Sequence, residues 1–161
     1  MSLFLVHYGR LGYLLDQTMT IPYAAMGALS RYERAVSVAT GNKALQEVHA
    51  ALRTRQAHGD INNKGVLRMI DQYFRELALV FTELKRVCKP GAHVVFVNDN
   101  VRYAGEVVPV DTITTALAES IGFAAEKIFV IPQRKGNSSQ QMKKFGRQSL
   151  RKSITVWRKP G

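Results

Sequence analysis

The middle of this 161-residue chain contains three adjoining motifs, Lys89-Pro90-Gly91, Val94-Val95-Phe96-Val97 and Asn98-Asp99-Asn100. The first motif predicts the end of a helix, because proline cannot continue a helix and glycine tolerates the sharp exit. The four apolar β-formers predict a strand that is covered on both faces. The polar triplet then follows the carboxyl end of that strand, which is where open α/β sheets place their ligands.

The residues before this strand predict a long amphipathic helix. Its apolar side chains recur at alternating spacings of four and three, so they share one face; they are Ile70, Phe74, Leu77, Phe81, Leu84 and Cys88. Cys88 is the single cysteine, which excludes an internal disulfide and fits a reducing cytoplasm. Its position predicts a small, buried apolar residue and not a nucleophile.

A second helix and two more strands follow. Pro109 and Asp111 open the helix, with Asp111 as its expected N-cap, and Gly122 ends it. Residues 128–131 and 154–157 predict two further buried strands. Alternation of helix and strand implies a right-handed crossover in a parallel sheet. The last strand follows without a helix, so it could pair antiparallel with its predecessor.

The chain divides at about residue 64. Residues 1–64 show no strand pattern and predict short helices, interrupted at Pro22 and at Gly41-Asn42. We expect this helical segment to be an insertion or cap that does not fold independently. Residues 65–161 carry the regular α/β pattern. An apolar content of 46% over 161 residues allows one core of fair size. No apolar run is long enough to cross a membrane.

The positive charge is concentrated in the last quarter of the chain. The net charge is +11, and residues 127–161 contribute ten basic side chains and no acidic one. Such a block concentrates anions, of which nucleic acid is the expected large one. The alternative is a solubilising tail without a partner.

A polar stretch of 21 residues, 132–152, separates the last two predicted strands. Loops of this length in compact domains are usually functional or disordered, and the clustered charges and amides favour a functional loop. The basic side chains suit phosphate groups, and they are Arg134, Lys135, Lys143, Lys144 and Arg147. The amides suit base edges, and they are Asn137, Gln140 and Gln141. Ser138 and Ser139 can also bond phosphate. The alternative is a solvated loop.

Residues 63–159, about 60% of the chain, resemble the C-terminal part of a bacterial S-adenosylmethionine-dependent DNA modification methyltransferase. Enzymes of this type methylate an exocyclic amino group of adenine or cytosine. The helix entering Lys89-Pro90-Gly91 is common to methyltransferases of this fold. Asn98-Asp99-Asn100 together with Gly136-Asn137-Ser138-Ser139-Gln140-Gln141 is much more specific.

The resemblance implies part of a doubly wound, Rossmann-like α/β sheet with an N-terminal helical segment. It also implies that Asn98, Asp99 and Asn100 line the cleft that holds the target base, although Asn and Asp are equally common as turn-formers. The basic loop would contact duplex DNA, whose target nucleotide must be extruded. The cofactor of the whole protein would be S-adenosylmethionine, and the expected location is the bacterial cytoplasm.

Two motifs of that family are absent from the sequence. They are the catalytic [Asp/Asn/Ser]-Pro-Pro-[Tyr/Phe/Trp] tetrapeptide and the Phe-x-Gly-x-Gly cofactor loop. We therefore expect the chain to start beyond the tetrapeptide, to hold no catalytic residue and to be inactive alone. The four histidines show no ligand spacing, so no metal site is predicted. A partial sheet would leave an apolar edge that favours self-association. The alternative function is a non-enzymatic nucleic-acid-binding module.

Overall fold

The computed structural model describes residues 3–7, 26–132, 144–146 and 148–161. The elements are, in chain order, β1 (Leu3–His7), α1 (Met26–Thr40), α2 (Lys43–Ala57), α3 (Val66–Val87), β2 (His93–Asp99), β3 (Val101–Tyr103), β4 (Glu106–Val108), α4 (Val110–Ile121), β5 (Ala124–Pro132) and β6 (Arg151–Arg158). The predicted α/β class is confirmed, and helices expected from the sequence correspond to α1, α2, α3 and α4. The short helix expected before Pro22 lies outside the described residues.

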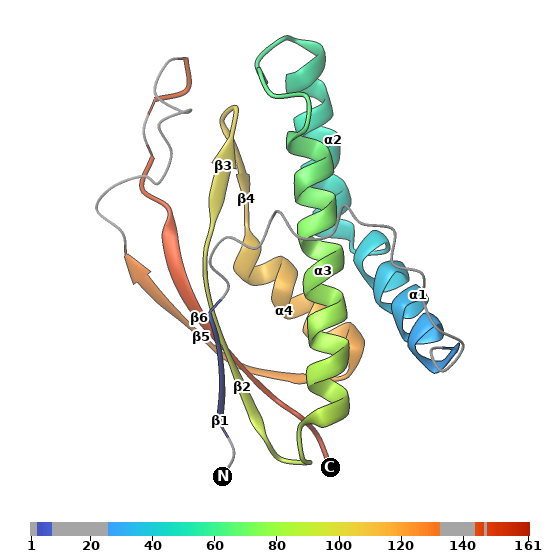
Figure 1. Ribbon diagram of the computed structural model, residues 1–161. Coiled ribbons are helices and arrows are strands. Elements are labelled where there is room, and N and C mark those ends of the chain that lie inside the picture. The colour runs from blue at the N-terminus through green and yellow to red at the C-terminus, as the bar shows by residue number, and fades with distance from the viewer. Residues whose placement is uncertain (1–2, 8–25, 133–143, 147) are drawn as a thin grey trace.

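Four strands form the main sheet in the order β1-β2-β6-β5, shown edge-on in Figure 1. β1 runs parallel to β2, and β6 runs antiparallel to both β2 and β5. The antiparallel pairing of the last strand with its predecessor is therefore confirmed. β2 and β5 run in the same direction but are separated by β6, so they are not neighbours in the sheet. A complete doubly wound sheet stays a prediction.

The expectation of no strand before residue 65 is wrong. β1 pairs with β2 along its whole length, from Leu3 opposite His93 to His7 opposite Val97. The run Leu3-Phe4-Leu5-Val6 is too short for a period to identify it as a strand. Its conformation depends on a partner about 90 positions away, and β-propensity is strongly dependent on such tertiary context.

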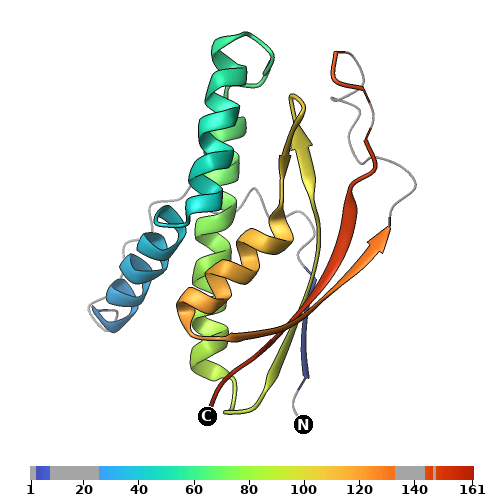
Figure 2. The same cartoon turned by 180° about the vertical axis from the view of Figure 1, so that it is seen from behind.

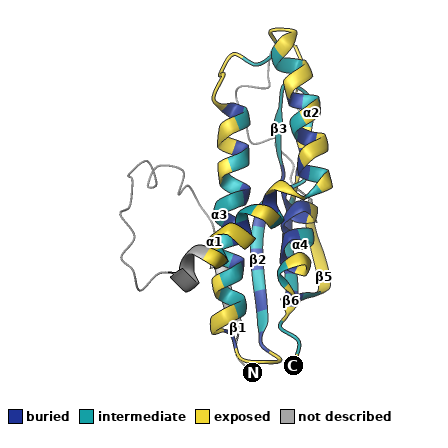
Figure 3. Ribbon diagram, turned by 90° about the vertical axis from the view of Figure 1, so that its right-hand side faces the viewer, coloured by how far each residue is buried: buried dark blue, intermediate teal, exposed yellow. Residues whose placement is uncertain are grey.

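The described helices lie on one face of the sheet (Figures 2 and 3). The core forms where the amphipathic α3 packs against β2 and β6. Phe81 of α3 is fully buried, with its ring centroid 5.4 Å from Phe96 of β2 and 4.8 Å from Trp157 of β6. Cys88, just beyond α3, is 3% exposed, which confirms its predicted burial. That burial raises the pKa of its thiol.

The sheet is less covered than the apolar runs predict. In β2, Val94 and Phe96 are buried, whereas the intervening Val95 and Val97 are half-buried. β5 forms one end of the described sheet and is exposed on both faces. Its four apolar residues, expected to be buried, are Ile128, Phe129, Val130 and Ile131, with exposed fractions between 40% and 52%. An apolar run in the sequence shows that its side chains are hydrophobic, but it does not show which element covers them. In this structure β5 is the bare apolar edge that was expected of a partial sheet. None of the described helices is both long and apolar enough to cross a membrane.

Candidate functional site

The polar triplet after the central strand is mostly buried. Asn98 and Asp99 end β2, and Asn100 follows. Asn98 is 8% exposed and donates from Nδ2 to the Thr114 hydroxyl of α4 at 3.3 Å. Because that hydroxyl itself donates to the Val110 carbonyl at 2.7 Å, it must accept from Asn98. The Oδ1 atom of Asn98 is therefore left buried without a partner among the described residues.

Asn100 joins the end of β2 to its two neighbours. Its backbone N–H donates to the Arg151 carbonyl of β6 at 3.1 Å, and its Oδ1 accepts from the Asp111 backbone N–H of α4 at 3.2 Å. The structure therefore places Asn98 and Asn100 at the carboxyl end of β2, against the N-terminal turns of α4. Their role in holding a base stays a prediction, as does that of Asp99.

Asp111 is fully buried at the start of α4 and organises this end of the sheet. Its Oδ2 accepts from Arg151 Nε at 2.7 Å and from the Ser153 hydroxyl at 2.6 Å, both on β6. Burial raises the pKa of Asp111, but the hydrogen bonds from Arg151 and Ser153 outweigh it, and the resulting pKa is below the ordinary value. The expected N-cap role is wrong: Pro109 occupies the N-cap position, and Asp111 lies in the first turn. No local pattern marks this cluster, because Asp111 is about 40 residues away from Arg151 and Ser153 in the chain.

A tight hairpin, formed by β3 and β4, projects beyond the end of β2. Its turn has positive φ angles at Ala104 (48°) and Gly105 (88°), the backbone combination of a two-residue type I′ hairpin. A side chain at position 105 would also collide with the Phe145 ring, since a Cβ would lie 2.8 Å from Cδ1. Glycine at position 105 therefore satisfies both the backbone conformation of this turn and its close contact with Phe145.

The hairpin anchors the returning end of the basic loop. Arg102 of β3 donates to the Gly105 carbonyl at 2.9 Å and to the Phe145 carbonyl at 3.1 Å. Arg55 of α2 stacks over the Phe145 ring, 5.3 Å from its centroid, and bonds Glu106 at 2.7 Å. Segments that are far apart in the sequence thus meet beyond the carboxyl end of β2. Arg55, Arg102 and Phe145 were not singled out by the sequence analysis, since no local pattern marks them.

Lys144 is the single residue of the predicted DNA-binding set that falls within the described part of the chain. Its Nζ lies 2.8 Å from Oδ1 of Asp60, just beyond the end of α2. This hydrogen bond lowers the pKa of Asp60. The other members lie outside the described residues, and they are Arg134, Lys135, Asn137, Ser138, Ser139, Gln140, Gln141, Lys143 and Arg147.

The described residues do not group into a metal site. No three His, Cys, Asp or Glu side chains converge in these parts of the chain. A cavity of about 430 Å³ lies among α1, α2 and α3, and three of its lining residues are arginines. The positive sulfonium of S-adenosylmethionine does not fit such surroundings.

Comparison with curated proteins places the chain beside one class of enzyme, the type II methyltransferases. It is 57% identical over 138 residues to M.BsoBI of Geobacillus stearothermophilus, a match that covers 86% of this chain and 27% of that protein. It is 43% identical over 141 residues to M.AvaI of a Nostoc species and of Anabaena variabilis, covering 88% of this chain and 29% of those proteins.

The predicted resemblance to bacterial modification methyltransferases is confirmed by these matches. The chain spans less than a third of the length of the relatives. No family model matches the chain, and no solved structure matches it.

Proposed function

We propose that this chain is the C-terminal part of a DNA methyltransferase that transfers a methyl group from S-adenosylmethionine to an exocyclic amino group of adenine or cytosine in duplex DNA. The observation that carries the proposal is the 57% identity to M.BsoBI over 138 residues. In this proposal the end of β2 forms one wall of the base-binding cleft, and the basic loop contacts DNA phosphates.

The geometry supports this division of roles. The loop returns at Lys144 and Phe145, where Arg102 and Arg55 hold it beside the β3–β4 hairpin. That hairpin begins directly after Asn100, so the loop anchor and the polar triplet lie at the same end of the sheet. Because phosphate contacts position a protein on the duplex, an anchored basic loop here would orient the DNA over the cleft.

The chain by itself does not supply the chemistry. The cofactor loop and the catalytic tetrapeptide are absent from the sequence, and the described cavity does not suit the cofactor. We therefore assign no step of methyl transfer to its residues.

A chimera tests the proposed function. The matching segment of M.BsoBI is replaced by this chain, and incorporation of labelled methyl groups into the DNA substrate of M.BsoBI is measured. The chimera should methylate, and the isolated chain should not. A chimera that folds and still binds the cofactor but transfers nothing would contradict the proposal. If the chimera were inactive in this way and the isolated chain still bound duplex DNA, the alternative of a non-enzymatic nucleic-acid-binding module would replace the methyltransferase proposal.

Neutralising the loop is expected to weaken DNA binding. Replacing Arg134, Lys135, Lys143 and Lys144 together by glutamine should lower affinity for duplex DNA by about 10- to 100-fold and reduce the slope of log K against log salt by up to about 3 to 4. Fluorescence anisotropy at several salt concentrations measures both quantities. The matched control replaces four exposed basic residues outside the basic block, namely Arg34, Lys43, Arg86 and Lys89. An equal loss in both variants would remove the loop from the interface.

The bare edge leads to a prediction about the isolated chain. We expect it to self-associate through β5, because unpaired backbone groups beside exposed apolar side chains favour strand pairing. Sedimentation velocity should show a mass that rises with concentration. Phe129→Lys, which places a charge on β5, should keep the chain monomeric. Val87→Lys, at an equally exposed residue (53%) of α3, should not. A wild-type monomer at high concentration would refute this prediction and weaken the case for a partial sheet.

A further inference from the structure

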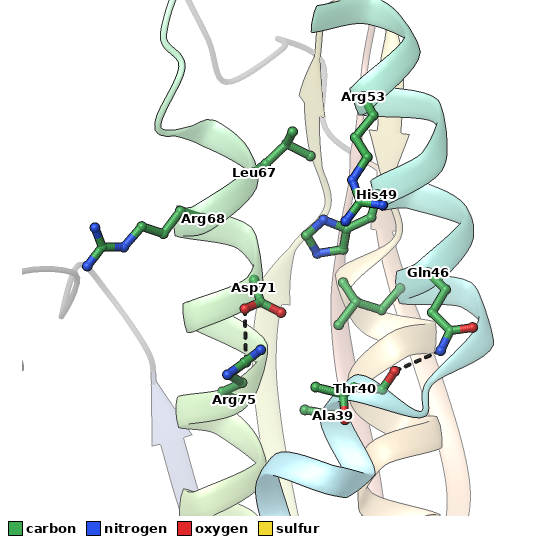
Figure 4. A pocket seen from close by; sticks show the side chains of 10 residues that line it. Ala39, Thr40, Gln46, His49, Arg53, Leu67, Arg68, Asp71 and Arg75 are labelled. Atoms are coloured by element: carbon green, nitrogen blue, oxygen red, sulfur yellow. Dashed lines mark hydrogen bonds and ion pairs between the residues drawn. The ribbon is translucent and has the colours of Figure 1, made fainter.

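The cavity among α1, α2 and α3 is a second feature of the structure, on the helical part of the chain (Figure 4). Its volume of about 430 Å³ falls in the range of small-ligand sites. Apolar side chains from all three helices line part of it, and they are Ala39, Leu45 and Leu67. The remaining lining is polar and strongly charged.

The charges in this cavity are unbalanced. Arg53, Arg68 and Arg75 carry three positive charges, and Asp71 is the one carboxylate that lines it. Asp71 Oδ2 lies 2.9 Å from Arg75 Nε, an ion pair that leaves the terminal nitrogens of that guanidinium for other acceptors. Arg68 extends away from α2, whereas Arg53 lies beside His49 on the α2 side (Figure 4).

His49 adds a donor or acceptor without a partner. Its Nε2 atom is buried, and none of the described residues bonds it. Burial lowers the pKa of the ring; Asp71 acts against this, and Arg53 and Arg75 reinforce it. The ring lies between two arginines and one carboxylate. Its unsatisfied Nε2 could donate a hydrogen bond to an anionic oxygen.

We propose that this cavity binds a phosphate group, with Arg53 and Arg75 as its cationic ligands and His49 Nε2–H as a neutral donor. Guanidinium groups suit this anion because their planar donors match two oxygens at once. The apolar lining would contact the group that carries the phosphate. This inference does not depend on the proposed methyltransferase function, since the cavity shares no residue with the end of β2 or with the basic loop.

The test follows the His49 ring signals by NMR while inorganic phosphate is added at constant ionic strength. The signals should shift in a saturable way. Arg53→Gln should weaken the apparent affinity at least about tenfold, and Asp71→Asn should strengthen it several-fold, because it removes the competing carboxylate. Arg53 is exposed, so its replacement should not impair folding. The matched control is Arg86→Gln, further along α3. Arg86 forms an ion pair with Glu83, and in this variant Glu83 keeps its ion pair with Arg31.

The proposal would be overturned if the His49 signals did not change. It would also be overturned if Arg53→Gln and Arg86→Gln reduced the affinity for inorganic phosphate equally. A second arm identifies the source of the phosphate. If a short DNA duplex displaces inorganic phosphate, the site takes a backbone phosphodiester. If inorganic phosphate binds and the duplex does not displace it, the site takes a small phosphorylated molecule. Both results support a phosphate site, and each is independent of the chimera's activity.

Discussion

Replacing Phe81 by alanine is expected to lower the free energy of unfolding by about 3 to 5 kcal/mol, the usual cost of truncating a buried aromatic residue. Phe81 is fully buried and projects from α3 onto the two central strands, β2 and β6. Its ring meets Phe96 and Trp157 edge-on, with interplanar angles of 84° and 76°. The change would therefore leave a cavity where the helix layer contacts the sheet, and it would also remove two favourable aromatic pairs.

Urea unfolding followed by fluorescence measures this effect directly, because Trp157 is the single tryptophan and is fully buried. The matched control is Phe129→Ala on the exposed strand β5, where 52% of the residue is accessible and the expected loss is below about 1 kcal/mol. Phe81→Leu should lie between the two and keeps the comparison measurable if the alanine variant is largely unfolded. Similar losses for Phe81→Ala and Phe129→Ala would show that the core is not where the structure places it.

The position of Phe81 could be predicted from the sequence, because a helix with a strong apolar period fixes its own buried face. The same local logic identified the break between α1 and α2 at Gly41-Asn42 and the end of α4 at Gly122. Asn42 accepts from the Leu45 backbone N–H, and Gly122 adopts a φ of 104°. These signals depend on neighbours within about four positions, so the sequence displays them.

The order of the strands could not be predicted in this way. β6 enters between β2 and β5, and β1 joins the far side of β2. Both pairings link residues that are far apart in the chain. The apolar runs of β5 and β2 each contain three β-branched residues and one phenylalanine, yet one run lies at the edge of the described sheet and the other inside it. Neighbours in the sheet set their burial, and a local pattern does not contain that information.

The candidate site shows the same limit. Its location at the carboxyl end of β2 was predicted, since Asn98-Asp99-Asn100 directly follows an obvious strand. The contacts that fix it were not, because Arg151 and Ser153 meet Asp111 only through the register of β6. The loop residues expected to contact DNA stay a prediction.

Replacing Asp111 by alanine is expected to cost about 3 kcal/mol of stability at neutral pH, because it leaves the donors of Arg151 and Ser153 without their buried acceptor. Arg151 is partly accessible, with 42% of its side chain exposed, so water recovers some of the loss. Ser153→Ala removes a single donor and should cost less, about 1 to 2 kcal/mol. Glu119→Ala, on the exposed side of the same helix, should change stability by less than about 0.5 kcal/mol.

The pH dependence separates this ion pair from simple packing. The pKa of Asp111 in the folded chain lies below its ordinary value of 3.8, so the folded state binds a proton less readily than the unfolded state. Its stabilising contribution is fully present above pH 3.8 and is lost as the pH falls through the lower, folded pKa. The difference in unfolding free energy between wild type and Asp111→Ala should therefore narrow in acid. A difference that stays constant from pH 7 down to pH 2 would mean that Asp111 acts through packing alone.

The same residue connects stability to the candidate site. The Asp111 side chain connects the start of α4 to β6, and its backbone N–H donates a hydrogen bond to the Asn100 side chain at the end of β2. Loss of the carboxylate should thus loosen the end of the sheet from which the hairpin and loop anchor extend, before it loosens the aromatic core. Amide hydrogen exchange in Asp111→Ala should accelerate in residues 98–108 more than in residues 70–81. In Phe81→Ala the order should be reversed.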